Sequence, residues 1–324
     1  MARLQYQPRR RVLSAEELRF FRTEGYLVIP SLMDPALCAA ARDRLWEHNQ
    51  SSRLRRDEPS SWVGPLPACD ENDEEGDYRR GYRWQLRSCA GEPLFMDLLP
   101  RACWAIAEQL LGVGACTYPR GGDPGAKPMP APLTPFAPSG ARTRGIYCTL
   151  PRGEEEPAEA RLPLNEQPGG HFDSGVTDDS MTYQRFMVTG LIDDTPPGCG
   201  GFTLYPRSHT RLYDLALRAR RDGLAPASAE AKERLAALVA EIDADTEPVD
   251  CCGPEGTVVL WHRATMHTVA ANYTEPPAIR QGIIYDFLSA QPATGGNGMA
   301  RMGSGCRCGG WGQGLGYGTG GPRP

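Results

Sequence analysis

The chain has 324 residues, of which 40% are hydrophobic and 23% are charged, and its formal net charge is -5. This composition is that of an ordinary globular protein, without the basic field that binds nucleic acid and without an apolar run long enough to span a bilayer. No apolar stretch follows the basic N-terminal residues, so we expect no secretory signal and a location in the cytoplasm or an organelle interior. The eleven cysteines lack the spacing of a disulfide framework or a zinc knuckle, and we expect them to be reduced.

Clear signals for helix ends lie near the N-terminus. Ser14 and Glu17 form a capping-box pair that predicts the start of a helix, and Gly25 is a typical stop. Residues 26–30, YLVIP, then predict a short strand. The Asp-Pro pair at 34–35 predicts the cap and first turn of a second helix.

The next part of the chain mixes loops with one helical region. Clustered charges over 70–81 predict a solvated loop, because like charges repel one another. Residues 92–112 predict a third helical region, broken or kinked at Pro100. The segment 119–142 holds seven prolines and therefore cannot form a regular element. It is either disordered or a lid over a site, and its composition does not separate the two.

From residue 144 onward the pattern changes to short strand-like runs. Separated by Gly, Pro and Asp, these runs predict a sandwich or barrel, and they lie at 144–150, 185–192, 201–206, 256–261 and 280–288. Residues 228–242 predict a helix inserted into this β region. We therefore expect a flexible N-terminus at 1–12, one domain at 13–290 with the loop 119–142 and a helical insertion at 226–243, and a Gly-rich disordered tail at 291–324.

The residues GGHFD (169–173) place a histidine and an aspartate two positions apart. Positions i and i+2 of a strand face the same side, so His171 and Asp173 can converge on one ion. Alone the pair is a weak signal, because such a pair is more often a turn with a hydrogen-bonded histidine than a ligand set.

A second block, GTVVLWHRATMHTVAANYTEPPAIR (256–280), supplies what this pair lacks. Either His262 or His267 would complete two imidazoles and one carboxylate, the facial triad that leaves adjacent positions open on iron(II). Arg280 then has a purpose, because a guanidinium fork can hold the distant carboxylate of an α-keto acid that chelates the iron.

These motifs resemble the phytanoyl-CoA dioxygenase family of iron(II)- and 2-oxoglutarate-dependent oxygenases. The resemblance extends from Leu13 to about Leu288. It covers LSAEELRFFRTEGYLVIPSLMDPAL, the GGHFD site, DDTPPGCGGFTLYPRSH and the block at 256–280. It implies a mostly β fold with a double-stranded β-helix (jelly-roll, cupin-like) core and N-terminal helices packed on it.

The resemblance also implies an activity and a site. His171, Asp173 and His267 would bind Fe(II), and Arg280 would bind the C5 carboxylate of the cosubstrate 2-oxoglutarate. The enzyme would use O2 to hydroxylate a C–H bond of a small organic or acyl substrate, with release of succinate and CO2. Asp173 favours hydroxylation, because halogenating relatives of such enzymes replace this carboxylate with a small residue.

Other polar residues near the motifs each have two interpretations. The Thr189 hydroxyl could bind the cosubstrate carboxylate or face the core. Tyr147 and Thr149, on the strand before the site, could contact cosubstrate or substrate, or have a plain core or surface role. We interpret His262 and His209 as structural.

Two rival functions stay open. The protein could be a catalytically silent jelly roll that serves as a binding module, or a zinc-dependent hydrolase that uses the same three ligands. Retention of the ligands together with Arg280 favours the oxygenase, since zinc hydrolysis gives the arginine no role. The sequence identifies neither the substrate nor the oligomeric state.

Overall fold

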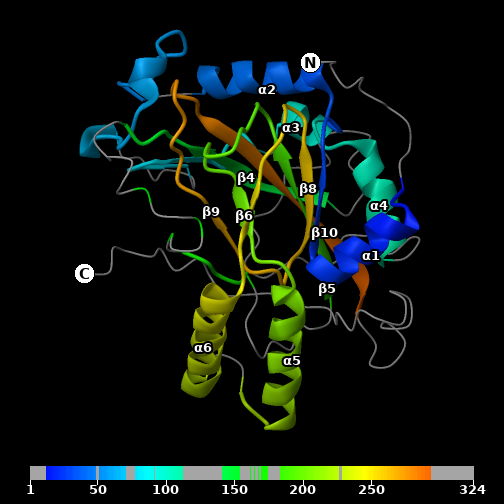
Figure 1. The fold of residues 1–324 in the computed structure, drawn as a ribbon. Coiled ribbons are helices and arrows are strands. Elements are labelled where there is room, and N and C mark those ends of the chain that lie inside the picture. The colour runs from blue at the N-terminus through cyan, green and yellow to red at the C-terminus, as the bar shows by residue number, and fades with distance from the viewer. Residues whose placement is uncertain are drawn as a thin grey trace.

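The computed structural model describes residues 12–48, 51–70, 77–90, 92–111, 141–153, 161, 164, 167, 169–173, 183–225 and 228–292. Two antiparallel sheets form the body of this part of the chain (Figure 1). Most of the predicted flexible N-terminus, of the Gly-rich tail and of the segment 119–142 lies outside the described residues, but Gln291 and Pro292 of the predicted tail belong to the last strand. Of the helices that are described, none has both the length and the apolar character needed to cross a membrane.

The larger sheet has seven strands in the order β1-β8-β5-β10-β4-β3-β2. Their bounds are β1 (Tyr26–Ile29), β2 (Tyr78–Arg80), β3 (Arg83–Leu86), β4 (Ala141–Thr149), β5 (Tyr183–Leu191), β8 (Val258–His262) and β10 (Arg280–Pro292). The smaller sheet has the order β7-β6-β9. Its strands are β6 (Phe202–Leu204), β7 (Val249–Cys251) and β9 (His267–Val269).

An apolar cluster joins the two sheets. Phe202 and Leu204 of the smaller sheet share this cluster with Met187, Val259 and Trp261 of the larger one. All neighbouring strands pair antiparallel. Two antiparallel sheets therefore enclose one interior, which confirms the expected jelly-roll core.

Helices cover the outer face of the larger sheet. They are α1 (Ala15–Glu24), α2 (Pro35–Glu47), α3 (Pro93–Asp97) and α4 (Arg101–Leu111), and two 3-10 turns lie at Pro59–Trp62 and Ala68–Asp70. Apolar residues of these helices, including Phe21, Leu45 and Phe95, share a cluster with Ile283 and Phe287 of β10. This packing leaves the opposite face of β10 free to line the interior.

The predicted helix ends are confirmed. The Ser14 hydroxyl accepts from the Glu17 backbone N–H at 3.1 Å, and the Glu17 carboxylate accepts from the Ser14 N–H at 2.9 Å. Gly25 ends α1 with a positive φ of 84°, and a Cβ there would lie 2.5 Å from Nδ1 of His209. Pro100 separates α3 from α4. These signals depend on residues close together in the sequence, so they can be read without knowledge of the fold.

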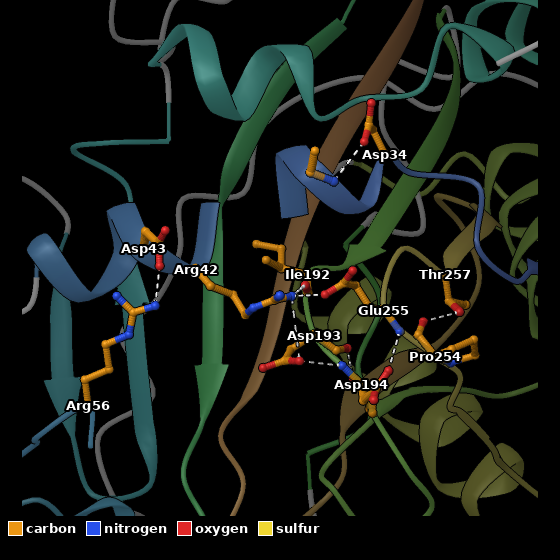
Figure 2. A network of polar contacts seen from close by, with 12 residues as sticks. Asp34, Arg42, Asp43, Arg56, Ile192, Asp193, Asp194, Pro254, Glu255 and Thr257 are labelled. Carbon is orange, nitrogen blue, oxygen red and sulfur yellow. Dashed lines mark hydrogen bonds and ion pairs between the residues drawn. The ribbon is translucent and has the colours of Figure 1, made fainter. Parts of the chain in front are cut away.

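An ion-pair network fastens α2 to two turns of the sandwich (Figure 2). Arg42 donates to the Ile192 carbonyl at 2.8 Å and to the Glu255 carboxylate, and its NH1 lies 3.8 Å from Oδ1 of Asp193. Asp194 accepts from the Glu255 backbone N–H at 2.7 Å. Helix α2 is thereby tied to the turn after β5 and to the turn before β8.

Two interpretations of the sequence are wrong. Residues 70–81 are not simply a solvated loop, because β2 lies within them and Asp70 and Asp77 are buried. Asp77 accepts from the backbone N–H groups of Arg87 and Ser88 at 2.7 and 2.9 Å, and such bonds compensate burial of a carboxylate. In addition, β4 starts at Ala141, so the last two residues of 119–142 are in a strand.

A helical hairpin projects beyond one end of the sandwich, between β6 and β7 (Figure 1). It consists of α5 (Ser208–Arg221) and α6 (Ala229–Asp245); α6 matches the predicted helix at 228–242, whereas α5 was not predicted. Its apolar core, the hairpin cluster, contains Tyr205, Leu212, Tyr213, Leu215, Ala216, Ala219, Ala231, Leu238, Ile242, Ala264 and Met266.

Candidate metal centre

The three predicted ligands come together in the structure. Nε2 of His171 and Nε2 of His267 each lie 3.9 Å from Oδ1 of Asp173. One ligand atom from each residue lies within 4.8 Å of the others. Two imidazoles and one carboxylate at this spacing leave room for a single metal ion and suit iron(II) chemically.

Backbone pairing brings these residues together from distant parts of the chain. His171 and His267 form an isolated antiparallel bridge, in which each N–H donates to the other's carbonyl at 3.0 Å. Residues 169–173 thus lie beside β9 as a short extended segment, here called the ligand segment. Its i, i+2 geometry places His171 and Asp173 on one face, as the sequence predicts.

Hydrogen bonds to backbone carbonyls fix the tautomer of both histidines. Nδ1 of His171 lies 3.0 Å from the Gly169 carbonyl, and Nδ1 of His267 lies 3.0 Å from the Thr265 carbonyl. A carbonyl can only accept, so each Nδ1 carries the proton and each Nε2 keeps its lone pair. Nε2 is the atom that faces Asp173, which is the orientation that metal-binding histidines need.

The surroundings of His267 keep its ring neutral. Burial lowers the pKa of His267 to about 4, and the neighbouring His171 ring adds to the effect. The His267 ring packs against Trp261 at 4.7 Å and Phe202 at 5.5 Å between centroids. A neutral, immobile imidazole binds a metal ion without first losing a proton. His171 is exposed, so the centre has one buried side and one open side.

Arg280 lies in the sandwich interior and is only 1% exposed. Strand register places it on the same face of β10 as Ile284, which packs on the cluster between the sheets. Its NH1 donates to the Tyr147 carbonyl at 3.2 Å, whereas its Nε has no hydrogen-bond partner among the described residues. Desolvation lowers the pKa of Arg280, but a guanidinium stays charged. A buried cation with donors to spare fits an anionic ligand.

Gly282 makes room for this guanidinium. A Cβ at Gly282 would lie 2.9 Å from Cζ of Arg280, closer than real contacts allow. The arginine side chain therefore lies along its own strand, over the glycine. This packing holds the cation inside the sandwich instead of letting it reach solvent.

The other predicted cosubstrate contacts also line the interior. Tyr147 pairs with Gly282 and Thr149 pairs with Arg280 across β4 and β10. Thr189 is fully buried, and its hydroxyl accepts a hydrogen bond from Nε1 of Trp261 at 3.0 Å. Thr189 thus supports the ring that packs on His267, whatever else it contacts.

We expect Thr189→Val to lower the free energy of unfolding by roughly 1–3 kcal/mol, because it leaves the buried indole N–H of Trp261 without an acceptor. Urea denaturation of the purified variant measures this change. Thr189→Ser keeps the hydroxyl and is the matched control. Equal stability of the Val and Ser variants would show that the hydrogen bond contributes nothing.

His262 and His209 lie away from the candidate ligands and make structural contacts. His262 ends β8 opposite Phe186, and its Nδ1 accepts from the Ala264 N–H at 3.1 Å. The His209 ring lies 5.4 Å from it and bonds through Nε2 to the Arg22 carbonyl at 3.1 Å. These contacts join α1, α5 and β8, which supports the structural interpretation of both residues.

Acid is expected to destabilise the wild-type protein more steeply than a His262→Gln variant. Burial, and then the nearby His209, lowers the pKa of His262 from 6.5 to about 3. The unfolded chain therefore binds more protons between these values, so the free energy of unfolding falls as the pH drops from 6.5 toward 3. One such group contributes at most about 1.4 kcal/mol per pH unit. Urea denaturation at several pH values tests this, and parallel curves for the two proteins would contradict it.

Two residues that support the ligands were missed in the sequence. Arg263 is buried, and its NH2 donates to the Asp173 carbonyl at 3.1 Å. Trp261 packs on the His267 ring. Both stand in the block at 256–280, but the pattern does not reveal which of its residues face the site.

The family resemblance is confirmed for the segment that carries the centre. Residues 170–281 match the model of the family described as Phytanoyl-CoA dioxygenase (PhyH). This range contains all three candidate ligands and Arg280. No curated protein sequence is similar enough to this chain to count as a match.

The chain is also similar to several solved structures, each at low sequence identity. AviO1 from Streptomyces viridochromogenes Tue57 is 17% identical, with 88% of this chain and 96% of that chain covered and a TM-score of 0.45. SnoK, a non-heme alpha ketoglutarate dependent carbocyclase from nogalamycin biosynthesis, is 18% identical, with 87% and 86% covered and a TM-score of 0.46. HygX from Streptomyces hygroscopicus, solved with nickel and 2-oxoglutarate, is 16% identical, with 85% and 87% covered and a TM-score of 0.43.

Proposed function

We propose that this protein is an iron(II)- and 2-oxoglutarate-dependent dioxygenase that hydroxylates a C–H bond of a small organic or acyl substrate. The proposal rests on one observation, the convergence of His171, Asp173 and His267 within 4.8 Å, with Nε2 of both histidines directed at the Asp173 carboxylate. Burial of Arg280 in the same sandwich supports the proposal. A buried cation is costly unless an anion pairs with it, and the carboxylate of 2-oxoglutarate would be such an anion.

Each residue has a role in this proposal. His171, Asp173 and His267 would hold the iron from one side, and Arg280 would hold the C5 carboxylate of 2-oxoglutarate. Thr189 and Tyr147 would complete the wall beside that carboxylate. When bound, iron(II) would activate O2, the oxidant, and 2-oxoglutarate would supply two electrons, so that one oxygen atom enters the C–H bond and the other enters succinate, which is released with CO2.

The surrounding side chains would protect this chemistry. Trp261 and Phe202 close the buried side of His267 and exclude water there. The exposed side, next to His171, is where a substrate would approach. The Arg263 guanidinium donates to the Asp173 backbone carbonyl and so would restrain the main chain that carries this ligand.

Anaerobic spectroscopy tests the proposal without knowledge of the substrate. Iron(II) and then 2-oxoglutarate are added to the apo protein, and the visible charge-transfer band of the chelate is expected. Admission of O2 is then expected to yield succinate, slowly in the absence of substrate. Tight zinc binding without a band or succinate would favour a hydrolase, and no metal binding at all would favour a silent binding module.

Hydroxylation needs its own test, because enzymes that use the same metal and cosubstrate can catalyse different reactions. Candidate substrates are incubated with the loaded enzyme under isotopically labelled O2. A product that has gained one labelled oxygen supports hydroxylation. A product that forms with succinate but without the label would keep the oxygenase and contradict hydroxylation.

A further inference from the structure

We infer that the α5–α6 hairpin positions the metal ligands, and that Phe172 is the side chain through which it does so. Phe172 stands between His171 and Asp173 in the ligand segment. The inference rests on the proposed function, since it takes these two residues as ligands. It assigns Phe172 as a positioning residue that does not touch the metal ion.

Each of the two segments that carry the ligands has one side chain in contact with the hairpin cluster. Phe172 is half-buried and packs against this cluster. Met266 directly precedes His267, is fully buried and is a member of the cluster. Alternate residues of an extended segment face opposite sides, so Phe172 is directed away from the side on which His171 and Asp173 converge. Both ligand-bearing segments are therefore anchored in the same apolar core.

The backbone of the ligand segment also lies directly on α6. A Cβ at Gly170 would be 2.4 Å from Cε of Met266 and 3.2 Å from Oδ1 of Asp243, a residue of α6. It would also be 3.3 Å from the hydroxyl oxygen of Tyr205, another member of the hairpin cluster. A larger residue here would displace the flexible end of Met266 and press on Asp243 and Tyr205, so the ligand segment approaches the hairpin closely.

Twisting about its own axis is the motion of the ligand segment that side-chain packing can oppose. Among the described residues, the bridge to the smaller sheet is the pair His171–His267, and Arg263 donates to the Asp173 carbonyl. A single bridge fixes the position of a strand but resists twisting about its axis poorly. Twisting would swing His171 and Asp173 together relative to His267. Packing of Phe172 in the hairpin opposes that rotation and so sets the geometry of the centre.

Cobalt(II) binding to the apo protein tests the inference, because its visible bands report coordination geometry. Phe172→Ala is expected to weaken Co(II) affinity by about tenfold or more and to alter the bands, since loss of a supporting group typically costs 10–100-fold. Phe172→Leu, which keeps an apolar anchor, is expected to restore most of both. The matched control is Leu37→Ala on α2, because Leu37 is also partly buried but packs on the cluster between the helices and the larger sheet. We expect that variant to lose stability while its Co(II) affinity stays within about twofold of wild type.

The outcomes separate the two proposals. A wild-type protein that does not bind Co(II) overturns the proposed function, and the inference with it. If the wild type binds and Phe172→Ala binds equally well with unchanged bands, the inference alone is overturned. An equal loss of affinity in Leu37→Ala also overturns it, because the effect would then follow stability instead of position. Should Phe172→Ala fail to fold, Phe172→Val decides by the same measurement.

Discussion

Arg280→Met is expected to weaken 2-oxoglutarate binding strongly while metal binding persists. Arg280 is a buried cation that the proposal pairs with the C5 carboxylate, and removal of one member of a buried charge pair costs roughly 2–5 kcal/mol. The affinity for 2-oxoglutarate should therefore fall by at least about 30-fold. Anaerobic titration of the iron-loaded variant, followed by the charge-transfer band, measures this loss. Methionine fills much of the same volume, so the sandwich should stay folded.

Two controls define what the arginine does. Arg280→Lys keeps the charge but loses the planar fork, and its affinity should lie between those of the wild type and the methionine variant. Arg79→Met removes another buried arginine, one that donates to the Asp70 carbonyl at 3.0 Å near β2, and should leave 2-oxoglutarate binding unchanged. An Arg280→Met variant that shows the band at wild-type concentrations of 2-oxoglutarate would remove the basis for the cosubstrate site.

His267→Ala is expected to lower metal affinity by more than about 100-fold and to stop succinate formation. The substitution removes one of three donors, a larger change than the loss of a supporting group, which already costs 10–100-fold. It also opens a cavity against Trp261 and Phe202, so some loss of stability is expected. Isothermal titration of the apo protein with Co(II) measures the affinity, and a urea curve measures the stability.

His262→Gln is the matched control for this variant. It removes the other histidine of the same block, which bonds Ala264 and lies beside His209 away from the centre. Its metal affinity should equal that of the wild type. If His262→Gln lost metal binding while His267→Ala kept it, the assignment of the two histidines would be reversed.

Local signals account for what could be predicted of the fold. The capping box at Ser14, the stop at Gly25 and the break at Pro100 depend on residues close in sequence, and all three are confirmed. Helix α5 was missed because it starts without such a signal: Arg207 occupies its N-cap in a left-handed conformation and makes no side-chain cap. The three-residue strands β7 and β9 depend on pairing partners that are distant in sequence, so the residues around them do not predict a strand.

The candidate site shows the same division. The i, i+2 spacing of His171 and Asp173 is readable because it is local, whereas the bridge from His171 to His267 spans almost a hundred residues and is not. Residue patterns alone left two histidines open for the third ligand. The structure places His267 beside His171 and Asp173, because the turn between the two histidines ends β8 of the larger sheet at His262 and leads into β9 of the smaller sheet at His267. The role of the hairpin as a support was hidden for the same reason.

The proposed metal ligand and the proposed carboxylate-binding cation belong to different layers of the sandwich. His267 starts a strand of the smaller sheet, and Arg280 starts a strand of the larger one. A molecule that reaches both must cross the gap between layers, which in stacked sheets is set by side-chain packing at roughly 10 Å. The spacing between the two sheets would therefore limit which lengths of keto acid can contact both groups.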